Sequence, residues 1–265
     1  MINRIKDIIK NQIRKSGLYV EKSTSAKDVV SLIKKMHPVK TSIPLIRLGS
    51  SKDGGYLVPD DLKNITACFS PGVGRMSDFE MDCLANGMKL FLADKSVDYP
   101  GTEDPQLKFL KKYIGPFNNE DFITLDDWVK DSIKEDKEDL MLQMDIEGFE
   151  YACILNMSEQ LLKQYRIIVI EFHNLHKMWN KEFFKIVELT FLKILSHHNC
   201  VHLHPNNIKK PYELYGVSIP SVLEITFLRK DRAQVLGYNK DYPHPLDADN
   251  TNNDNVTLPE IWYRS

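Results

Sequence analysis

Short apolar runs alternate with stretches of helical periodicity from Ile65 onward. Such an alternation predicts βαβ units, which build a parallel sheet covered by helices. The apolar runs predict strands over 65–70, 89–94, 140–145, 167–172, 200–203 and 223–228, and the periodic stretches predict helices over 78–86, 126–133, 151–164 and 181–198. The chain is therefore expected to fold as an α/β sandwich.

Two of the predicted strands end in acidic residues. The runs 140–145 and 167–172 are mostly apolar, as in central strands buried on both faces, until they reach Asp145 and Glu171. Open α/β sheets bind their ligands beyond the carboxyl ends of their strands. We therefore expect both acids to lie at a ligand site.

The segments that flank the alternating region predict surface structure. Residues 47–59 contain Asp53-Gly54-Gly55, a tight-turn signal between apolar flanks, which indicates a β-hairpin. The Asn-rich segment 247–255 predicts an exposed loop, and residues 258–263 are expected to dock back onto the body.

Residues 1–40 predict a basic helical extension before a domain that spans 41–265. Isoleucines recur at helical spacing among basic side chains from residue 2 to residue 13, and Gly17 is a natural stop. This amphipathic helix over 2–15 either lies on an anionic membrane surface or packs its isoleucines on the domain while its lysines stay solvated. The pattern leaves both alternatives open.

Charge and composition narrow the class of protein. The formal net charge is −2, yet residues 1–40 hold ten Lys/Arg against three Asp/Glu, which leaves +7 there and −9 on the remainder. An acidic body argues against nucleic acid as a partner. The four cysteines show no CxxC pair, no apolar run is long enough to span a membrane, and no secretory signal is evident. We expect a cytoplasmic protein with reduced thiols, in peripheral contact with the membrane if the basic helix binds lipid.

A glycine turn follows the first predicted strand of the sheet. Ser70 and Pro71 lead into Gly72-Val73-Gly74, where the missing Cβ atoms let a ligand approach the main chain. Asp94 ends the next strand about 20 residues later, where nucleotide-binding folds place an acid against ribose hydroxyls. The pair suits NAD or S-adenosylmethionine, and Ser77 at the place of a third glycine weakens the dinucleotide alternative.

The stretch LMLQMDIEGFEYACILNM (140–157) resembles the "KIDIEGxE" signature of FkbM-type methyltransferases. These enzymes use S-adenosylmethionine and mostly methylate hydroxyls of sugars or related natural products. FSPGVG, LADKS, ITLDDW and VIEFHN agree with the family in order and spacing, so that the resemblance spans about 47–228. One departure is that Ser70-Pro71 replaces the usual Asp-Val pair, so the acid that commonly approaches the methionine amino group is missing.

The resemblance implies a fold and a set of cofactor contacts. The fold is a Rossmann-like class I methyltransferase sandwich, with a mostly parallel central sheet, an antiparallel last strand and the N-terminal helical extension. The cofactor contacts fall on Ser70, Gly72, Gly74 and Asp94. Asp126 of ITLDDW either approaches the adenine or begins a helix as its N-cap.

Methyl transfer to a sugar hydroxyl needs an in-line geometry and a group that removes or weakens the hydroxyl proton. Asp145, Glu147, Glu171 and His173 can supply that group. We expect His173 to be the general base, because an imidazole titrates near working pH, although a strand-end capping role is an alternative. Asp145 and Glu171 could instead bind Mg²⁺ or another divalent cation together with an acceptor diol.

Two further features have plain structural interpretations. Glu150 is expected to favour a helix N-terminus through its charge. The four histidines within 197–204 suggest metal ligands, but their spacing fits a helix end followed by one face of a strand. We therefore expect no metal in this segment.

Three functional hypotheses remain. The first is an S-adenosylmethionine-dependent O-methyltransferase that acts on a sugar or glycan precursor. The second is an NAD-dependent sugar oxidoreductase or epimerase, which lacks the expected Tyr-xxx-Lys arrangement. The third is a non-catalytic nucleotide-binding scaffold, which the unusual FSPGVG turn favours.

Overall fold

A sheet of seven strands forms the centre of the protein, in the order β11-β14-β10-β9-β4-β5-β6. The computed structural model describes residues 10–18, 20–74, 78–98, 104–134 and 138–264. The strands are β4 (Ala67–Pro71), β5 (Lys89–Ala93), β6 (Leu107–Leu110), β9 (Leu140–Met144), β10 (Tyr165–Phe172), β11 (His198–Pro205) and β14 (Leu223–Arg229). Neighbours from β6 through β10 pair in parallel, whereas β14 runs antiparallel to both β10 and β11. The expected α/β sandwich with a mostly parallel central sheet is confirmed.

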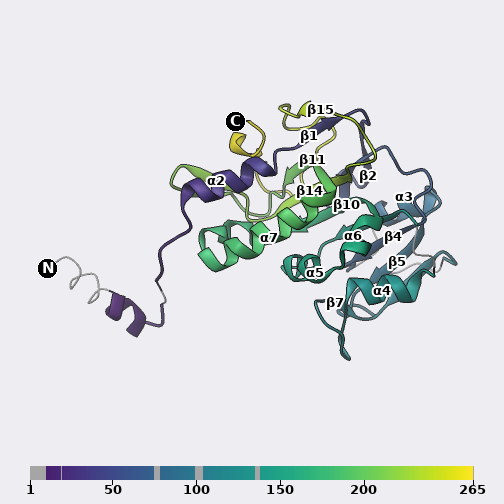
Figure 1. Ribbon diagram of the computed structural model, residues 1–265, viewed down its shortest axis with the longest axis horizontal. Helices are drawn as coiled ribbons and strands as arrows, with labels where there is room; N and C mark the ends of the chain where they lie inside the picture. Colours follow the sequence, from purple (N-terminus) through teal and green to yellow (C-terminus); the bar gives the residue numbers. More distant parts are fainter. Residues whose placement is uncertain (1–9, 19, 75–77, 99–103, 135–137, 265) are drawn as a thin grey trace.

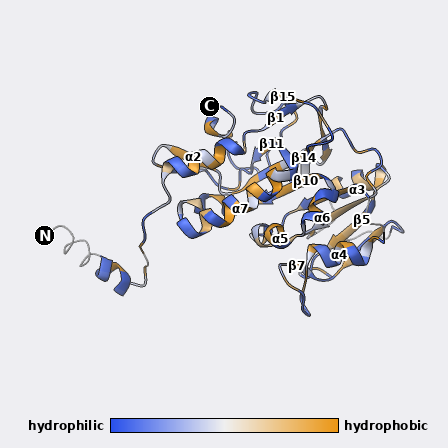
Figure 2. Ribbon diagram, in the orientation of Figure 1, coloured by the Kyte–Doolittle hydropathy of each residue, from blue (hydrophilic) through white to orange (hydrophobic). Residues whose placement is uncertain are grey.

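Each face of the sheet has its own hydrophobic core. One core lies beneath α2 (Ala26–Lys35), α4 (Leu125–Ser132), α5 (Glu150–Asn156), α6 (Glu159–Gln164), α7 (Lys181–His197) and the 3-10 helices η1 (Leu175–Trp179) and η2 (Glu260–Trp262). The other lies beneath α3 (Asp78–Ala85) and the hairpin of β2 (Leu45–Gly49) and β3 (Gly55–Pro59). Figure 1 shows α7 lying across the sheet beside β14 and β10. Strands are mainly hydrophobic and helices such as α7 are two-sided in Figure 2, as burial of one helical face requires.

Alternation along β10 explains how polar groups reach the site. Ile167 and Val169 pack in the core on the hairpin side, and Ile168 and Ile170 pack in the opposite core. Because successive side chains point to opposite faces, Glu171 continues the hairpin side of the strand. It is only 6% exposed. The apolar part of the strand therefore anchors the sheet, and its last residues carry the chemistry.

Most of the predicted elements agree with the structure, and the differences are one divided helix and several strands that were not predicted, among them most of the short pairs outside the central sheet. The expected helix 151–164 is two helices, because Ser158 accepts a hydrogen bond from Leu161 N and begins α6 as an N-cap. The edge strand β6 was not predicted. Helix α2 falls within the extension that was expected to be helical, but its residues Val29, Leu32 and Ile33 are buried in the main core, which was not expected.

Short antiparallel and parallel pairs complete the fold. They are β1 (Val39–Thr41) with β15 (Val235–Tyr238), β12 (Tyr212–Leu214) with β13 (Val217–Ile219), and β7 (Tyr113–Ile114) with β8 (Phe122–Ile123). The predicted hairpin within 47–59 is confirmed as β2–β3. The predicted docking of 258–263 is also confirmed, because Trp262 is fully buried and its Nε1 donates to Ser218 O at 3.1 Å.

The two described parts of the N-terminal extension differ in their contacts with the rest of the protein. Residues 10–15 are helical and stand away from the body in Figure 1, whereas residues 26–36 pack into the main core. Most of the amphipathic helix expected over 2–15 lies outside the described residues, so its membrane contact stays a prediction. Within the part of the chain that the structure describes, no helix is long and apolar enough to cross a membrane.

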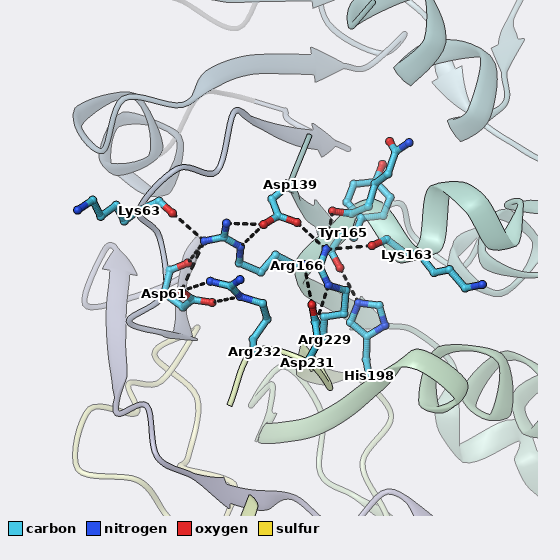
Figure 3. A network of polar contacts seen from close by, with 11 residues as sticks. Asp61, Lys63, Asp139, Lys163, Tyr165, Arg166, His198, Arg229, Asp231 and Arg232 are labelled. Carbon is cyan, nitrogen blue, oxygen red and sulfur yellow. Dashed lines mark hydrogen bonds and ion pairs between the residues drawn. The ribbon is translucent and has the colours of Figure 1, made fainter. Parts of the chain in front are cut away.

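An ion-pair network ties the strands together at the sheet edge opposite the acidic strand ends (Figure 3). The buried guanidinium of Arg166 at the start of β10 bonds to Asp139 Oδ2 through Nε at 2.9 Å and to the carbonyl oxygens of Asp61 and Lys63. Arg229 Nη1 reaches Asp139 Oδ1 at 2.6 Å from the end of β14. This network fixes the starts of β9 and β10, so their far ends are held in register at the site.

Candidate active site

A cavity of about 350 Å³ opens at the carboxyl ends of β4, β5 and β9. Gly72, Asp94, Asp145 and Glu147 line it together with Ala93, Ser96, Tyr113, Ile114, Phe122, Ile146 and Phe149. The glycine turn, the second-strand acid and the DIEG segment thus converge on one cleft. This arrangement is the one expected of a nucleotide site with a reaction centre next to it.

Gly72 makes the turn possible through close contact with the chain itself. Its φ is +91°, and a Cβ at this position would lie 1.5 Å from the carbonyl oxygen of Asp145. The missing side chain therefore accommodates the DIEG backbone as well as exposing main chain to the cavity. Gly74, by contrast, has no atom of the described residues within 4 Å of an added Cβ, and it is not among the cavity's lining residues.

Asp94 is held at the cavity wall by its own loop. The carboxylate is 8% exposed, and its Oδ1 accepts hydrogen bonds from Ser96 N at 2.7 Å and Ser96 Oγ at 2.6 Å. The second oxygen carries no other hydrogen bond in the parts of the chain that are described here. The arrangement orients the carboxylate and leaves it acceptor capacity for a ligand.

Aromatic side chains form part of the cavity wall. Phe122 lies between Tyr113 and Phe149, with ring centroids 5.5 and 5.9 Å away, and all three line the cavity. Phe149 is 47% exposed although it is large and apolar. Sequence reasoning missed Tyr113 and Phe122 because β7 and β8 are too short to give a periodic signal, and it assigned no role to Phe149, which follows the DIEG segment. Flat apolar walls of this kind suit a purine or a sugar ring.

Besides Gly74, two residues whose side chains were expected at the cofactor lie outside the cavity. The buried hydroxyl of Ser70 is 2.8 Å from Glu80 Oε1 and 2.6 Å from Gln143 Oε1, beneath the turn. Asp126 Oδ2 accepts from Ser158 N at 2.9 Å, in a separate hollow between α4 and α6. The N-cap of α4 is Thr124 rather than Asp126. Neither Ser70 nor Asp126 lines the cavity.

Glu150 organises the DIEG turn from within. The carboxylate is fully buried, and its Oε1 accepts from Ile146 N at 3.2 Å and from Gly148 N at 2.9 Å. The same oxygen lies 3.1 Å from His173 Nδ1. The sequence predicted only that Glu150 favours a helix N-terminus. In the structure it also connects the turn after β9 to the residue that follows β10.

His173 lies at the centre of an acidic cluster. Its Nε2 is 3.4 Å from Glu171 Oε1, 3.5 Å from Glu147 Oε2 and 3.8 Å from Asp145 Oδ1. The main-chain oxygen of His173 accepts from Tyr151 Oη at 2.8 Å, which fixes the loop. All the predicted catalytic residues therefore gather around one imidazole nitrogen.

Burial and mutual repulsion change the acid–base properties of the cluster. Desolvation raises the pKa of Asp145 to about 7, and the neighbouring Glu147 and Glu150 charges add to it while His173 opposes it. Burial, Asp145 and Glu224 raise the pKa of Glu171 well above its ordinary value. Burial disfavours the imidazolium of His173, but Glu150 and the other acids outweigh that effect and raise its pKa. Shifts of this kind are typical of functional sites.

The histidine-rich segment takes no part in the cluster. His202 Nε2 bonds to Asp247 Oδ1 at 2.8 Å, and the buried His198 Nε2 contacts Tyr165 O at 2.7 Å. Among the residues that the structure describes, the group whose ligand atoms converge as at a metal site is Asp145, Glu171 and His173. The structural interpretation of 197–204 agrees with these contacts.

The fold and the cavity define a class of protein. A doubly wound sheet with a glycine turn after one strand, an acid after the next and a reactive cluster beside them is typical of nucleotide-dependent transferases and oxidoreductases. Residues 78–200 match the family model of the methyltransferase FkbM domain, which confirms the resemblance seen in the motifs. An FkbM domain suggests an S-adenosylmethionine-dependent methyltransferase. Comparison with curated proteins gave no match.

Proposed function

We propose that this protein is an S-adenosylmethionine-dependent O-methyltransferase that acts on a hydroxyl of a sugar, in a glycan or its precursor. The observation that carries the proposal is the single cavity that joins Gly72 and Asp94 to Asp145 and Glu147. The first pair suits an adenosyl ribose, and the second borders the His173 cluster. Cofactor and acceptor would thus meet at the DIEG turn.

The residues of the cavity divide into cofactor-holding and reaction groups. Asp94, oriented by Ser96, accepts hydrogen bonds from the two ribose hydroxyls, and the wall of Tyr113 and Phe122 covers the adenine. When bound, S-adenosylmethionine supplies an electrophilic methyl group. Ser70 and Asp126 have no role in this assignment, because their side chains are engaged outside the cavity.

The reaction groups support oxygen as the atom that accepts the methyl group, because they can activate a hydroxyl. An alcohol is a poor acid, so its oxygen becomes nucleophilic only when a base takes its proton or a cation lowers its pKa. Nε2 of His173 faces the side of the cluster bordered by the cavity residues Asp145 and Glu147 and can take the proton. A divalent cation on Asp145 and Glu171 is the second way to activate the hydroxyl.

A sugar is favoured as the acceptor because the cluster offers many hydrogen-bond acceptors beside an exposed aromatic face. Carboxylates of Asp145, Glu147 and Glu171 accept hydrogen bonds from hydroxyl groups. Phe149 presents an apolar ring to the same cavity, and sugars have an apolar face of matching size. The acidic surroundings disfavour acceptors that carry a negative charge next to the reacting hydroxyl.

Calorimetric titration with S-adenosylhomocysteine and with NAD tests the cofactor. We expect S-adenosylhomocysteine to bind, and Asp94→Ala to weaken it at least tenfold, because about 1.4 kcal/mol of ribose interaction corresponds to that factor. Asp98→Ala is the matched control, since this acid of the same loop has a side chain that is 97% exposed. Binding of NAD in place of S-adenosylhomocysteine would favour an oxidoreductase.

Transfer of labelled methyl groups to a panel of neutral sugars, nucleotide sugars and lipid-linked glycans tests the acceptor. The expected product is a methyl ether on a neutral sugar. Label found only on nitrogen, or only on non-carbohydrate acceptors, would contradict the O-methylation of a sugar while leaving the cofactor assignment in place.

A further inference from the structure

Ligand atoms from three side chains converge at the end of β10. Single oxygens of Asp145 and Glu171 and one nitrogen of His173 all lie within 4.8 Å of one another. Nε2 of His173 is 3.4 Å from Glu171 Oε1 and 3.8 Å from Asp145 Oδ1. Good N–H···O hydrogen bonds are shorter, at about 2.7–3.2 Å. The imidazole thus faces two carboxylates without a well-formed hydrogen bond to either.

The distances between these ligand atoms are close to those between atoms that bind the same metal ion. Metal–ligand bonds of about 2.1 Å at tetrahedral or octahedral angles separate neighbouring ligand atoms by about 3.0–3.4 Å. The two distances from His173 Nε2 lie within this range or a few tenths of an ångström beyond it, and the third pair, Asp145 with Glu171, is within 4.8 Å, so side-chain rotations can bring the three atoms onto one ion. In addition, Asp145 Oδ1 is buried and has no hydrogen-bond partner in the described chain. Such an atom in a built site points to a missing ligand.

Glu150 supplies the support that a metal-binding histidine needs. Metal-ligating imidazoles almost always donate their other ring N–H to a carboxylate or carbonyl, which fixes the tautomer and the ring orientation. His173 Nδ1 lies 3.1 Å from Oε1 of Glu150, whose side chain is fully buried. With the proton on Nδ1, the lone pair of Nε2 points at the two carboxylates, as a ligand requires.

The negative charges of Asp145 and Glu171 are less well compensated than that of a neighbouring buried acid, Glu224. Glu224 lies directly across the ladder from Glu171 and is also buried. Yet Glu224 has partners, because Asn250 Nδ2 donates to its Oε1 at 2.6 Å and the charges of His204 and Arg47 favour its ionised form. Glu171 accepts only long hydrogen bonds, from Asn206 Nδ2 at 3.3 and 3.4 Å, and among the ion pairs of the described residues Asp145 and Glu171 have only His173. Their negative charge is therefore the part that a bound cation would neutralise.

We infer that Asp145, Glu171 and His173 are the protein ligands of one divalent ion of the first transition series, such as Mn²⁺, with Glu150 as the positioning residue for the imidazole. This inference rests on the proposed function for its purpose, since the ion would activate the acceptor hydroxyl, and it makes His173 a ligand instead of the base. One nitrogen and two carboxylate donors favour such ions over Mg²⁺, which prefers oxygen ligands alone.

The site also defines the acceptor more closely. Three protein ligands leave room for oxygens from outside the protein, and Asp145 is shared between the cluster and the cavity. An acceptor with two neighbouring hydroxyls can chelate the ion there, whereas an isolated hydroxyl cannot. The acceptor class is therefore a vicinal diol of a neutral sugar.

Titration of the full-length protein with Mn²⁺ alone, followed by electron paramagnetic resonance at pH 7.5, tests the inference. We expect one bound Mn²⁺ per chain, with Mg²⁺ at least tenfold weaker as a competitor. Electron spin-echo modulation should show one coupled nitrogen, and His173→Ala should remove it. Asp145→Asn and Glu171→Gln should each lower the affinity at least tenfold, and Glu150→Gln by about 10–100-fold, the usual effect of losing a supporting partner.

Glu224→Gln is the matched control, because it removes a buried acid next to Glu171 that has its own partners. Its affinity for Mn²⁺ should fall far less than that of Asp145→Asn or Glu171→Gln, because Glu224 acts on Glu171 only through its charge. Absence of binding at millimolar Mn²⁺, binding without nitrogen coupling, or an equal loss in Glu224→Gln would overturn the inference. Binding of S-adenosylhomocysteine, measured on the same variants, shows that they are folded. A protein that binds S-adenosylhomocysteine but no Mn²⁺ would retain the proposed function and lose only the metal site.

Discussion

At the scale of single residues, Gly72 is the position where the smallest change should have the largest effect. An added methyl group would meet the Asp145 carbonyl at 1.5 Å, and the φ of +91° is itself unfavourable for any residue with a Cβ. We expect Gly72→Ala to lower the free energy of unfolding by about 2–4 kcal/mol, as strain and overpacking combine. Urea denaturation measures the change.

Gly74→Ala is the control for that substitution. Gly74 lies two residues further along the same turn, has no left-handed φ, and has no atom of the described residues within 4 Å of the place that an added methyl group would take. The free energy of unfolding of this variant should stay within about 0.5 kcal/mol of the wild type. Equal losses in both variants would mean that the turn tolerates no side chain at all, and the specific contact with Asp145 would be refuted.

Residue types and spacing predicted the acids of the site but not their supports. The strands β5, β9 and β10 have clear apolar runs in the sequence, and parallel strands end at the same edge of a sheet. It could therefore be inferred that the residues at their carboxyl ends lie together, namely Asp94, Asp145, Glu171 and His173. Ser70 belongs to the same motif, yet its side chain points beneath the turn to Glu80 and Gln143. Which side of the chain a loop residue faces depends on tertiary contacts that no local pattern encodes.

At the scale of elements, hydrophobic periodicity located the central strands well and the peripheral ones poorly. β9 and β10 are buried along their full length, so their composition is distinctive. β6 is partly exposed at the edge of the sheet, and β7 and β8 have two residues each, so each lacks a clear pattern. The aromatic wall of the cavity comes from these weak elements, which explains why it was missed.

The Asn-rich loop is an element held by side-chain hydrogen bonds rather than by a core. Asn207 Nδ2 donates to Thr251 O at 3.0 Å and to Asn253 O at 3.1 Å, and its Oδ1 accepts from Thr251 N at 2.8 Å. We expect Asn207→Ala to speed hydrogen exchange of the Thr251 amide at least tenfold, because the loop loses its attachment to the segment that follows β11.

Asn252→Ala is the corresponding control, since Asn252 is an exposed member of the same loop. Its exchange pattern should match that of the wild type. If Asn207→Ala leaves the Thr251 amide protected, the loop is held by other contacts.

At the scale of the whole molecule, the free energy of unfolding should depend on pH through His198, which lies in the network of Figure 3. His198 is fully buried, and desolvation, together with the nearby Arg229 charge, lowers its pKa to about 4 although its bond to Tyr165 O opposes the shift. The unfolded chain binds this proton near pH 6.5, so the contribution of His198 is complete above pH 6.5 and is lost as pH falls toward 4.

We therefore expect the wild type to lose up to about 3 kcal/mol relative to His198→Gln between pH 6.5 and pH 4. Denaturation of both proteins at several pH values isolates the effect, because all other titrating groups are common to the pair. Parallel pH profiles would show that His198 becomes protonated within the fold at little cost.

Two segments far apart in the chain, 26–37 and 258–263, meet on one face of the sheet. His37 Nε2 lies 2.9 Å from the carbonyl oxygen of Ile261, and α2 packs beside η2, where Trp262 fills the core. During synthesis, α2 emerges from the ribosome long before η2 does. The part of the core that α2 shares with Trp262 therefore stays open until residue 262 has left the ribosome.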